Sequence, residues 1–447
     1  MRQADRQHEN DAGGETSGGD GVRMEVREAS AKYIVAKLDG KVSGWSSVKL
    51  GDLAAFRTGP FGSSLHKSDY VFGGVPVVNP MQIEDGRIKP TDRMSVAEAA
   101  AERLSEFRLR SGDVVIGRRG EMGRCAYIGS DQHGWLCGTG SMIVRCGREL
   151  DGRFAQRVLS SDQAVRAIES ASVGTTMINL NQQTLASLAL RIPVNVHEQA
   201  SIAEALTDAD ALIDSLEQLL TKKRQIKQGS MQELLTGRRR LPGFRSEWAE
   251  RRLADLADIR SGGTPSTRQS EFWDGDIPWC TPTDITALFG SKYISNTQRS
   301  ISEQGLKASS AELLPIGTVV MTSRATIGEC AIAAAPLATN QGFKNFVPSA
   351  KTSGEFLYYL LSTQKQAFLA LCSGSTFLEI GKRQLADFTV QCPADLDEQV
   401  AIAQVLSDMD TDITARESRL TKARALKQAM AQALLTGRIR LTEGAAA

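Results

Sequence analysis

The sequence predicts an α+β fold built as a pseudo-two-fold tandem repeat, in which two similar globular domains are separated by two long antiparallel helices that form an intramolecular coiled coil. The first observation is a duplicated stretch, because residues 197–241 and 397–441 align without a gap and are identical at about half of their positions. The second is that the segment before each stretch also matches its counterpart. The third is the lack of proline in both stretches, which is typical of long helices.

Apolar residues recur every three or four positions in both stretches and indicate a seam that packs one helix along another. They are Ile202, Leu206, Ala209, Ile213, Leu216 and Leu220 in the first stretch, and Ile402, Leu406, Met409, Ile413 and Leu420 in the second, which Arg416 interrupts. Gly237 and Gly437 stand where each helix would end. Two ordinary surface helices on separate domains are the alternative, but an unbroken helix of about 40 residues far exceeds the usual length of about 11–12.

The two globular segments, which we call head 1 (residues 44–196) and head 2 (residues 242–396), repeat the same turns and strands in the same order. Each begins with a Trp-x4-Leu-x2-Leu-Ala pattern and continues through an arginine into a loop rich in Gly, Pro, Ser and Thr. Each then has a glycine turn before a predicted strand and a returning strand that contains a cysteine. The matched positions are Trp45 and Trp248, Arg57 and Arg260, Gly112 and Gly317, and Cys125 and Cys330.

Composition excludes several classes of protein. No apolar run approaches the ~18 residues of a membrane span, and the N-terminus lacks the apolar region of a secretory signal. The seven cysteines include no C-x-x-C pair and no Cys/His spacing that suits zinc, so we predict no metal site. We expect a cytoplasmic protein with free thiols, in which Cys125 and Cys330 are small buried side chains.

The N-terminal 43 residues have little pattern. Residues 1–21 are rich in Gly, Asp, Glu and Gln and are predicted to be disordered. In residues 24–38 the apolar side chains have a spacing that is loosely compatible with a helix, so one helix is predicted there. Both Met1 and Met24 remain open as the natural start.

Chain order constrains how the repeat is built. Head 1 leads into the first helix at Pro193 with almost no linker, and a short loop joins the end of that helix to head 2. The second helix must run back along the first to pair the two seams, so we expect antiparallel helices that hold two similar heads apart. A helix of about 39 residues is roughly 58 Å long, which sets an upper bound of roughly 17 base pairs between the heads on B-DNA at ~3.4 Å per base pair.

The chain resembles the specificity (S) subunit of type I restriction-modification enzymes over nearly its whole length after residue 44. The resemblance is carried by the two heads, by E-Q-x-x-I-A at Glu198 and Glu398, and by Q-x-L-L-T-G-R at Gln232 and Gln432. We therefore divide the chain into a tail that could include a short helix (1–43), target recognition domain 1 (44–196), a central spacer helix (197–241), target recognition domain 2 (242–396), a C-terminal spacer helix (397–441) and a tail (442–447).

The resemblance implies that each head reads one half of a bipartite site in double-stranded DNA, and that the helices space the heads and dock two modification (M) subunits. Restriction (R) subunits would join that core. The chain itself would need no cofactor, since S-adenosylmethionine, ATP and Mg are expected on the partner subunits. A specificity subunit of a type IIB-like system, with a fused methylase-nuclease partner, differs only in the partner.

The sequence predicts no catalytic residues. It contains no N/D-P-P-Y/F methyltransferase motif, no Walker A loop, no H-E-x-x-H and no G-x-S-x-G. The net charge of +1 counts against DNA binding, because nucleic-acid binders often show a basic excess. Residues 44–196 carry 18 Lys+Arg against 15 Asp+Glu, and residues 245–396 carry 14 against 15. A coiled-coil adaptor whose heads bind proteins or small ligands therefore stays open as an alternative.

Candidate DNA contacts lie on the matched polar loops of the two heads. Arginine can grip guanine or phosphate with two hydrogen bonds, and Asn or Gln can pair with adenine. In head 1 we predict Arg57, Ser63, Ser64, His66, Lys67, Asn79, Gln82, Arg118 and Arg119. In head 2 we predict Arg260, Thr264, Ser266, Thr283, Asp284, Ser323, Arg324, Asn340, Gln341 and Lys344. The alternative for each of these residues is that it is an ordinary solvated loop residue without a DNA contact.

Overall fold

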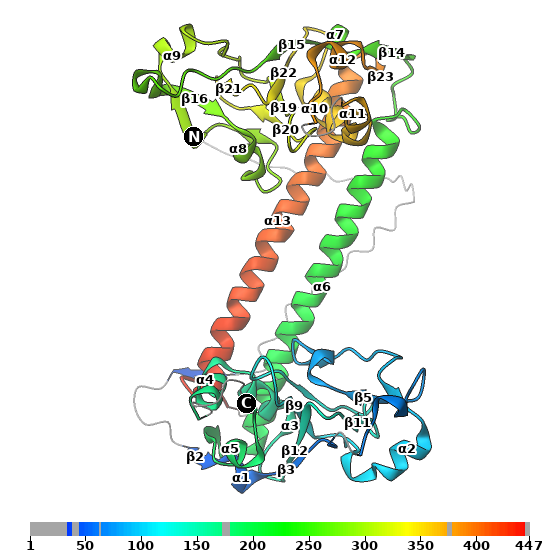
Figure 1. Cartoon of the computed structure of the whole chain (residues 1–447), viewed down its shortest axis with the longest axis vertical. Helices are drawn as coiled ribbons and strands as arrows, with labels where there is room; N and C mark the ends of the chain where they lie inside the picture. Colours follow the sequence, from blue (N-terminus) through cyan, green and yellow to red (C-terminus); the bar gives the residue numbers. More distant parts are fainter. Residues whose placement is uncertain (1–33, 38–43, 62–63, 172–178, 373–377, 443–447) are drawn as a thin grey trace, which may run out of the picture. The chain divides into compact units, whose positions relative to one another are not determined.

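The computed structural model describes residues 34–37, 44–61, 64–171, 179–372 and 378–442. The chain divides into two compact units: unit 1 comprises residues 1–208 and 427–447, and unit 2 comprises residues 209–426. Each unit contains one head together with segments of both long helices (Figure 1). The predicted disordered residues 1–21 lie outside the described part of the chain.

Unit 1 is built on one antiparallel sheet, one mixed sheet and short helices. The first sheet has the order β10–β9–β12–β3 and the second has the order β11–β5–β8–β4, while β13 pairs with β2 and β6 with β7. The strands are β2 (Trp45–Lys49), β3 (Ala54–Thr58), β4 (Tyr70–Val71), β5 (Val75–Val78), β6 (Ile83–Glu84), β7 (Arg87–Ile88), β8 (Ser95–Val96), β9 (Val114–Gly117), β10 (Cys125–Tyr127), β11 (Leu136–Cys137), β12 (Ser141–Cys146) and β13 (Ala189–Pro193). The helices are α1 (Leu50–Leu53), α2 (Glu98–Arg103), α3 (Gly152–Leu159), α4 (Asp162–Ala171) and α5 (Gln182–Ala186), with single 3-10 turns at Lys67–Asp69, Pro80–Gln82 and Ser105–Phe107.

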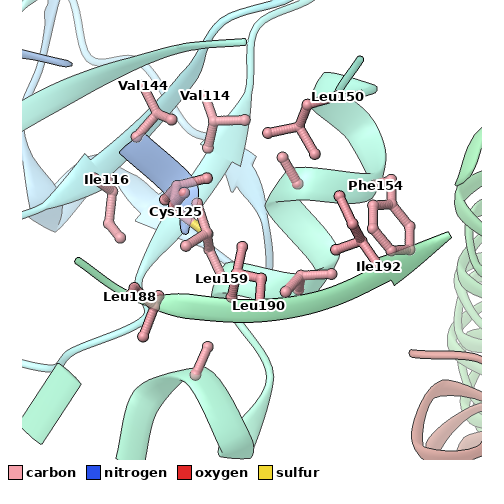
Figure 2. Close-up of a cluster of buried hydrophobic side chains, with 14 of the residues drawn as sticks. Val114, Ile116, Cys125, Val144, Leu150, Phe154, Leu159, Leu188, Leu190 and Ile192 are labelled. Atoms are coloured by element: carbon pink, nitrogen blue, oxygen red, sulfur yellow. The ribbon is translucent and has the colours of Figure 1, made fainter. Parts of the chain in front are cut away.

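The main core of unit 1 lies between the first sheet, helix α3 and strand β13. Figure 2 shows Val114, Cys125 and Val144 of the sheet facing Phe154 of α3 and Leu190 of β13. Burial raises the pKa of the Cys125 thiol to about 12, so this side chain stays protonated and acts as a small apolar group. The expectation that Cys125 is a buried structural residue is confirmed.

Unit 2 repeats the frame of head 1 in the same order. Its sheets have the orders β15–β22–β19–β20–β17 and β18–β16–β21, and β14 pairs with β23 as β2 pairs with β13. The strands are β14 (Trp248–Arg252), β15 (Ala257–Ser261), β16 (Trp273–Cys280), β17 (Tyr293–Ile294), β18 (Arg299–Ile301), β19 (Val319–Thr322), β20 (Cys330–Ala333), β21 (Ala338–Thr339), β22 (Phe343–Pro348) and β23 (Thr389–Pro393). The helices are α7 (Leu253–Leu256), α8 (Pro282–Thr286), α9 (Glu303–Lys307), α10 (Gly354–Thr363), α11 (Lys365–Leu371) and α12 (Lys382–Asp387), with a 3-10 turn at Ser270–Phe272.

The two long helices are α6 (Val196–Leu234) and α13 (Leu396–Leu435), and in unit 2 they run side by side (Figure 1). Arg224 of α6 pairs with Glu417 of α13 at 2.6 Å, and Arg424 of α13 pairs with Glu217 of α6 at 2.6 Å. These two ion pairs exchange equivalent residues of the repeat, so the helices are antiparallel and related by a pseudo-two-fold axis.

The predicted seam is confirmed in unit 2, where Ile213, Leu216 and Leu220 of α6 form a buried cluster with Leu420 of α13. The interruption at Arg416 is real. Its guanidinium pairs with Asp412 at 2.8 Å, but its Nε is buried without a hydrogen-bond partner among the described residues. A charged group in a seam costs stability and fixes the register of the two helices.

In each unit a glutamate at the start of one long helix binds an arginine that follows the end of the other, and we call this contact the helix joint. In unit 1, Arg440 donates from Nε and Nη2 to the Glu198 carboxylate at 2.9 and 2.5 Å, and Trp45 Nε1 donates to the same carboxylate at 3.3 Å. In unit 2, Arg240 donates to Glu398 at 2.5 and 2.7 Å and Trp248 Nε1 at 3.4 Å. The two repeated sequence motifs therefore meet in space.

The glutamine that follows each of these glutamates ties the helix to its head. In unit 2, Gln399 Nε2 donates to the carbonyls of Lys351 and Pro393 at 3.3 and 3.0 Å, and its Oε1 accepts from Ser353 N at 2.9 Å. In unit 1, Gln199 makes the same three hydrogen bonds to the backbones of Glu149, Pro193 and Asp151. A buried amide that is fully satisfied in this way fixes the direction in which the helix leaves the head.

The long helices end at Leu234 and Leu435, just before Gly237 and Gly437, where the sequence placed their ends, because these glycines adopt positive φ values of 69° and 70° and break the helical path. The last residues of the two predicted spacer segments, up to 241 and 441, therefore follow the helices rather than belong to them. The helix predicted over residues 24–38 is wrong where the structure describes it, since Ile34–Lys37 is strand β1 and pairs antiparallel with β24 (Ile439–Thr442). Backbone pairing with a distant strand outweighed a weak local helical pattern.

Candidate nucleic-acid interface

The polar loops of head 1 converge at one edge of its first sheet, which we call loop edge 1. Gly59, after β3, donates its N–H to Ser141 O at 3.0 Å, and Arg118, after β9, donates its N–H to Gly140 O at 2.9 Å. Leu180, which precedes α5, donates to Arg118 O at 2.9 Å. Three loops far apart in the sequence are thus joined by backbone hydrogen bonds.

Head 2 assembles loop edge 2 in the same way. Ser323, after β19, donates its N–H to Gly342 O at 2.7 Å, and Ile380, before α12, donates to Ser323 O at 3.1 Å. Gly262, after β15, donates to Phe343 O at 3.4 Å. The backbone frame of the two edges is therefore the same, although the side chains on it differ.

A glycine is required where the loop after β3 or β15 crosses the loop before β12 or β22. A Cβ at Gly59 would lie 1.9 Å from Gly138 O, and a Cβ at Gly262 would lie 1.9 Å from Asn340 O. Neither carbonyl belongs to a side chain that could rotate away. The close approach of backbones explains why both heads place a glycine after the matched arginine and small residue.

Eight of the predicted contact residues present exposed side chains on these loops. In head 1 they are Ser64, His66, Lys67 and Arg119, and in head 2 they are Ser266, Thr283, Arg324 and Gln341. Arg119 and Arg324 are equivalent, and each precedes a residue with positive φ, Gly120 or Ala325. Arg324 is bound to Glu379 at 2.9 Å, whereas Arg119 has no ion-pair partner within the part of head 1 that the structure describes.

Two predicted residues serve instead as internal helix caps. Gln82 is 4% exposed, and its Oε1 accepts the N–H of Asn79 at 2.7 Å. Asp284 is 5% exposed and accepts the N–H groups of Thr281 and Gln298, both at 2.8 Å. The equivalent turns of the two heads use the same device, because in each the third residue of the turn satisfies the N–H of the capping residue.

Three further predicted residues are buried at the loop edges. Arg118 donates from Nε to Leu180 O at 3.0 Å, and Ser323 is fully covered. Lys344 is 6% exposed, and its Nζ lies 3.7 Å from Glu379 Oε1. Burial lowers the pKa of this ammonium group. These side chains support the loops from beneath. The sequence alone could not distinguish them from their exposed neighbours, because both kinds of residue are polar and lie in the same loops.

The remaining predicted residues are partnered; Arg57, on strand β3, is exposed, and the others are half-covered. Arg57 binds Glu106 at 2.9 Å, and Arg260 binds Asp258 at 2.8 Å. Asn79 and Asn340 accept loop N–H groups at 3.3 and 2.8 Å, from Gly140 and Gly342 respectively. Thr264 hydrogen-bonds Gln341 across loop edge 2. Ser63 lies outside the described residues.

The structure adds the first residues of α5 and α12, which the sequence did not single out. Gln182 Nε2 donates to Thr58 Oγ1 at 3.0 Å and so lies beside loop edge 1. Its equivalent Lys382 and the neighbouring Arg383 are exposed, with the Arg383 side chain at 97%. The signal available in the sequence was their fixed distance from the matched leucines Leu185 and Leu385.

The loop edges thus offer hydroxyl, amide, imidazole and guanidinium groups, which are the groups that read base edges and phosphates. In the ranges that the structure describes, no cluster of three or more His, Cys, Asp or Glu is arranged to hold a metal ion. Over the same ranges, the helices lack the combination of length and hydropathy that a bilayer span needs.

A family model for the type I restriction modification DNA specificity domain matches the chain twice, over residues 42–228 and 245–422. These matches cover well over half of the sequence, and the chain belongs to this family. Each match takes in one head and most of the long helix that follows it.

Two relatives illustrate how the likeness is distributed. The type I restriction enzyme MjaIX specificity subunit of Methanocaldococcus jannaschii is 41% identical over 166 residues, which are 37% of this chain and 38% of that protein. The putative type I restriction enzyme MjaX specificity subunit of the same organism is 24% identical over 393 residues, which are 82% of this chain and 88% of that one. The first match therefore spans less than half of the relative's length.

A solved structure shares the fold. The crystal structure of the type I restriction-modification system S subunit from M. genitalium superposes with a TM-score of 0.54 at 17% sequence identity, covering 89% of this chain and 98% of that one. The predicted α+β class with two similar domains and a long antiparallel helix pair is confirmed.

Proposed function

We propose that this chain is the DNA sequence-specificity subunit of a type I restriction-modification complex, in which each head reads one half of a bipartite DNA site. The observation that carries the proposal is the pair of loop edges. Both use the same backbone hydrogen bonds, yet equivalent positions hold different side chains, such as Gln182 and Lys382 or Gly138 and Asn340. A constant frame with variable hydrogen-bonding groups suits two readers of different sequences.

The proposal assigns the other tasks to partner proteins. Modification subunits dock on the long helices and supply S-adenosylmethionine and base chemistry, and restriction subunits bring ATP- and Mg²⁺-dependent cleavage. The chain itself neither methylates nor cuts DNA. Its near-neutral charge means that the partners provide much of the salt-dependent contact with phosphates.

Exchanging head 1 tests the proposal. When residues 44–193 are replaced by the equivalent head of a related subunit, the assembled methylase should methylate a site in which only one half has changed, because the loops of head 2 are untouched. Methylome sequencing of cells that express the chimera measures this directly. A change in both halves contradicts independent reading. A wild-type complex that leaves DNA unmethylated, with heads that bind proteins instead, favours the adaptor alternative.

Two adjacent arginines give a sharper test of loop edge 1. Replacing the exposed Arg119 with alanine should weaken DNA binding by the assembled methylase about tenfold, since a lost base or phosphate contact costs about 1–3 kcal/mol, and should leave thermal stability unchanged. Replacing its buried neighbour Arg118 with alanine should mainly lower the melting temperature, because the Leu180 carbonyl loses a charged hydrogen-bond donor. Fluorescence anisotropy and calorimetry measure both effects. Equal DNA affinity of the Arg119→Ala and wild-type complexes would remove Arg119 from the interface.

A further inference from the structure

Three charged side chains form a row across loop edge 2, from the interior of head 2 to its surface. Lys344 of β22 is buried, and its Nζ lies 3.7 Å from Glu379 Oε1. The other carboxylate oxygen of Glu379 binds Arg324 Nη2 at 2.9 Å. The Arg324 side chain is exposed, so the outer end of the row faces solvent. We call Lys344, Glu379 and Arg324 the charge row.

The Glu379 carboxylate is held in place from two sides. Its backbone forms an antiparallel β-bridge with that of Arg324, and the N–H of the next residue, Ile380, donates to Ser323 O at 3.1 Å. Beneath it, burial lowers the pKa of Lys344, and the negative charge of Glu379 opposes that shift. A carboxylate that moved away would leave Lys344 as an uncompensated buried charge. Glu379 is therefore a fixed acceptor that restricts the orientation of the Arg324 side chain.

Head 1 has the same backbone frame with different residues in place of the charge row. Met142 takes the place of Lys344, because the strand registers put it opposite the end of β9 as Lys344 lies opposite the end of β19. Asn179 takes the place of Glu379, since each precedes the residue whose N–H ties its segment to the loop after β9 or β19. The equivalent arginine of head 1, Arg119, thus has neither the carboxylate nor the buried cation at these positions.

We propose that Arg324 reads a guanine in the half-site of head 2, that Glu379 is the positioning residue that orients it, and that Arg119 contacts a phosphate instead. This proposal rests on the function proposed above. Arginine reads guanine through two hydrogen bonds, to O6 and N7, which require one orientation of the guanidinium. A side chain that is already oriented loses less conformational entropy when it makes them. Phosphate contacts carry no sequence information and need no such support.

Variants of the charge row separate reading from general affinity. Arg324→Ala should reduce the preference for guanine at one position of the half-site about tenfold to a hundredfold and should change the affinity for random-sequence DNA little. Glu379→Asn with Lys344→Met gives head 2 the side chains of head 1 and releases Arg324, so about tenfold of the same preference should be lost. Glu379→Gln keeps an acceptor for Arg324 and should retain most of the preference.

Arg119→Ala is the comparison in head 1. If Arg119 contacts a phosphate, its loss should weaken binding to all sequences alike and reduce the slope of log affinity against log salt concentration by about one. The sequence preference of head 1 should stay unchanged.

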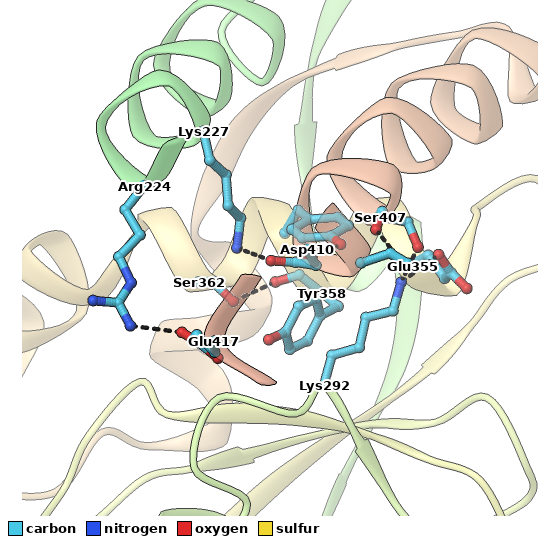
Figure 3. Close-up of polar contacts among 11 residues, drawn as sticks. Arg224, Lys227, Lys292, Glu355, Tyr358, Ser362, Ser407, Asp410 and Glu417 are labelled. Atoms are coloured by element: carbon cyan, nitrogen blue, oxygen red, sulfur yellow. Dashed lines mark hydrogen bonds and ion pairs between the residues drawn. The ribbon is translucent and has the colours of Figure 1, made fainter. Parts of the chain in front are cut away.

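A second ion pair of head 2 supplies the matched control for a merely structural role. Figure 3 shows Lys292 between Glu355 of α10 and Ser407 of α13, to which its Nζ donates at 2.9 and 2.8 Å. The Lys292 and Glu355 side chains are 10% and 37% exposed, against 7% and 37% for Lys344 and Glu379. Because this pair joins the head to a long helix, Glu355→Asn with Lys292→Met should lower the melting temperature comparably and leave the guanine preference unchanged.

Each variant is tested as the assembled methylase. The wild-type methylome first gives the half-site, and competition binding against DNA randomised in that half-site, at several sodium chloride concentrations, then measures preference and salt slope. Melting curves establish folding, and Arg324→Ala changes an exposed residue, so it tests the proposal even if the double variant unfolds.

Four outcomes would overturn the assignment. They are equal weakening of all sequences by Arg324→Ala, an affected position that is not a G·C pair, full guanine preference in the Glu379 and Lys344 double variant, and an equal loss of preference in the Lys292 and Glu355 control. A wild-type methylase that prefers no sequence contradicts the proposed function itself. That result is distinct from failure of the charge row, in which the wild type reads its site and the charge row variants read it equally well.

Discussion

Replacing Glu398 with alanine should lower the free energy of unfolding of unit 2 by about 3 kcal/mol, because removing one partner of a buried ion pair leaves the other charge uncompensated. The Glu398 side chain is 0% exposed and accepts from Arg240 twice and from Trp248 once. Arg240 keeps 29% exposure, so water compensates part of the loss. The variant Glu398→Gln should fall between alanine and the wild type, since its amide oxygen still accepts.

Glu417→Ala is the matched control on the same helix. Glu417 also pairs with an arginine, at 2.6 Å, but both side chains are well exposed, at 41% and 59%. Exposed pairs contribute about 0–1 kcal/mol, so this variant should unfold almost as the wild type does. Urea unfolding measures both, and hydrogen exchange in the first turns of α13 locates the effect. Equal stability of the two alanine variants would mean that the helix joint contributes little.

Inserting a short segment into each of the two long helices should lengthen by one base pair the gap between the two half-sites of the DNA, which neither head reads. Four helix-forming residues are inserted after Glu217 and four after Glu417, which are equivalent positions of the repeat. The ion pairs Arg224–Glu417 and Arg424–Glu217 lie outside the inserts and persist. Four residues add ~6 Å and leave a net rotation of roughly 40°, close to the about 34–36° by which one base pair turns DNA.

The seam tolerates this change, because an insertion of four residues locally unwinds a coiled coil without breaking it. Both half-sites should stay as they are, since neither head is altered. A control with four residues inserted in α6 alone should disrupt the matched pairing and assemble poorly. Methylome sequencing reads the gap directly. An active enzyme that keeps the original gap would show that the helices do not measure distance.

The sequence by itself determined the parts that follow from local periodicity and duplication. The three- and four-residue spacing from Ile202 to Leu220 is enough to predict a buried helical seam, since one face of a helix must bury its apolar stripe. Gly237 and Gly437 marked the helix ends, because glycine readily takes the positive φ that stops a helix. The matched turns and strands of the two heads were predictable for the same local reason.

Only the tertiary structure decided which of the polar residues are exposed. Arg118 and Arg119 are neighbours in one polar loop, yet one is buried against Leu180 and the other is exposed. Sequence could not separate them, because backbone hydrogen bonds from distant segments set the direction of each side chain. The same reason explains β1 and β24, whose pairing joins residues far apart in the chain. It also explains the helix joint, where Glu398 and Arg240 are bound through a fold that local pattern does not encode.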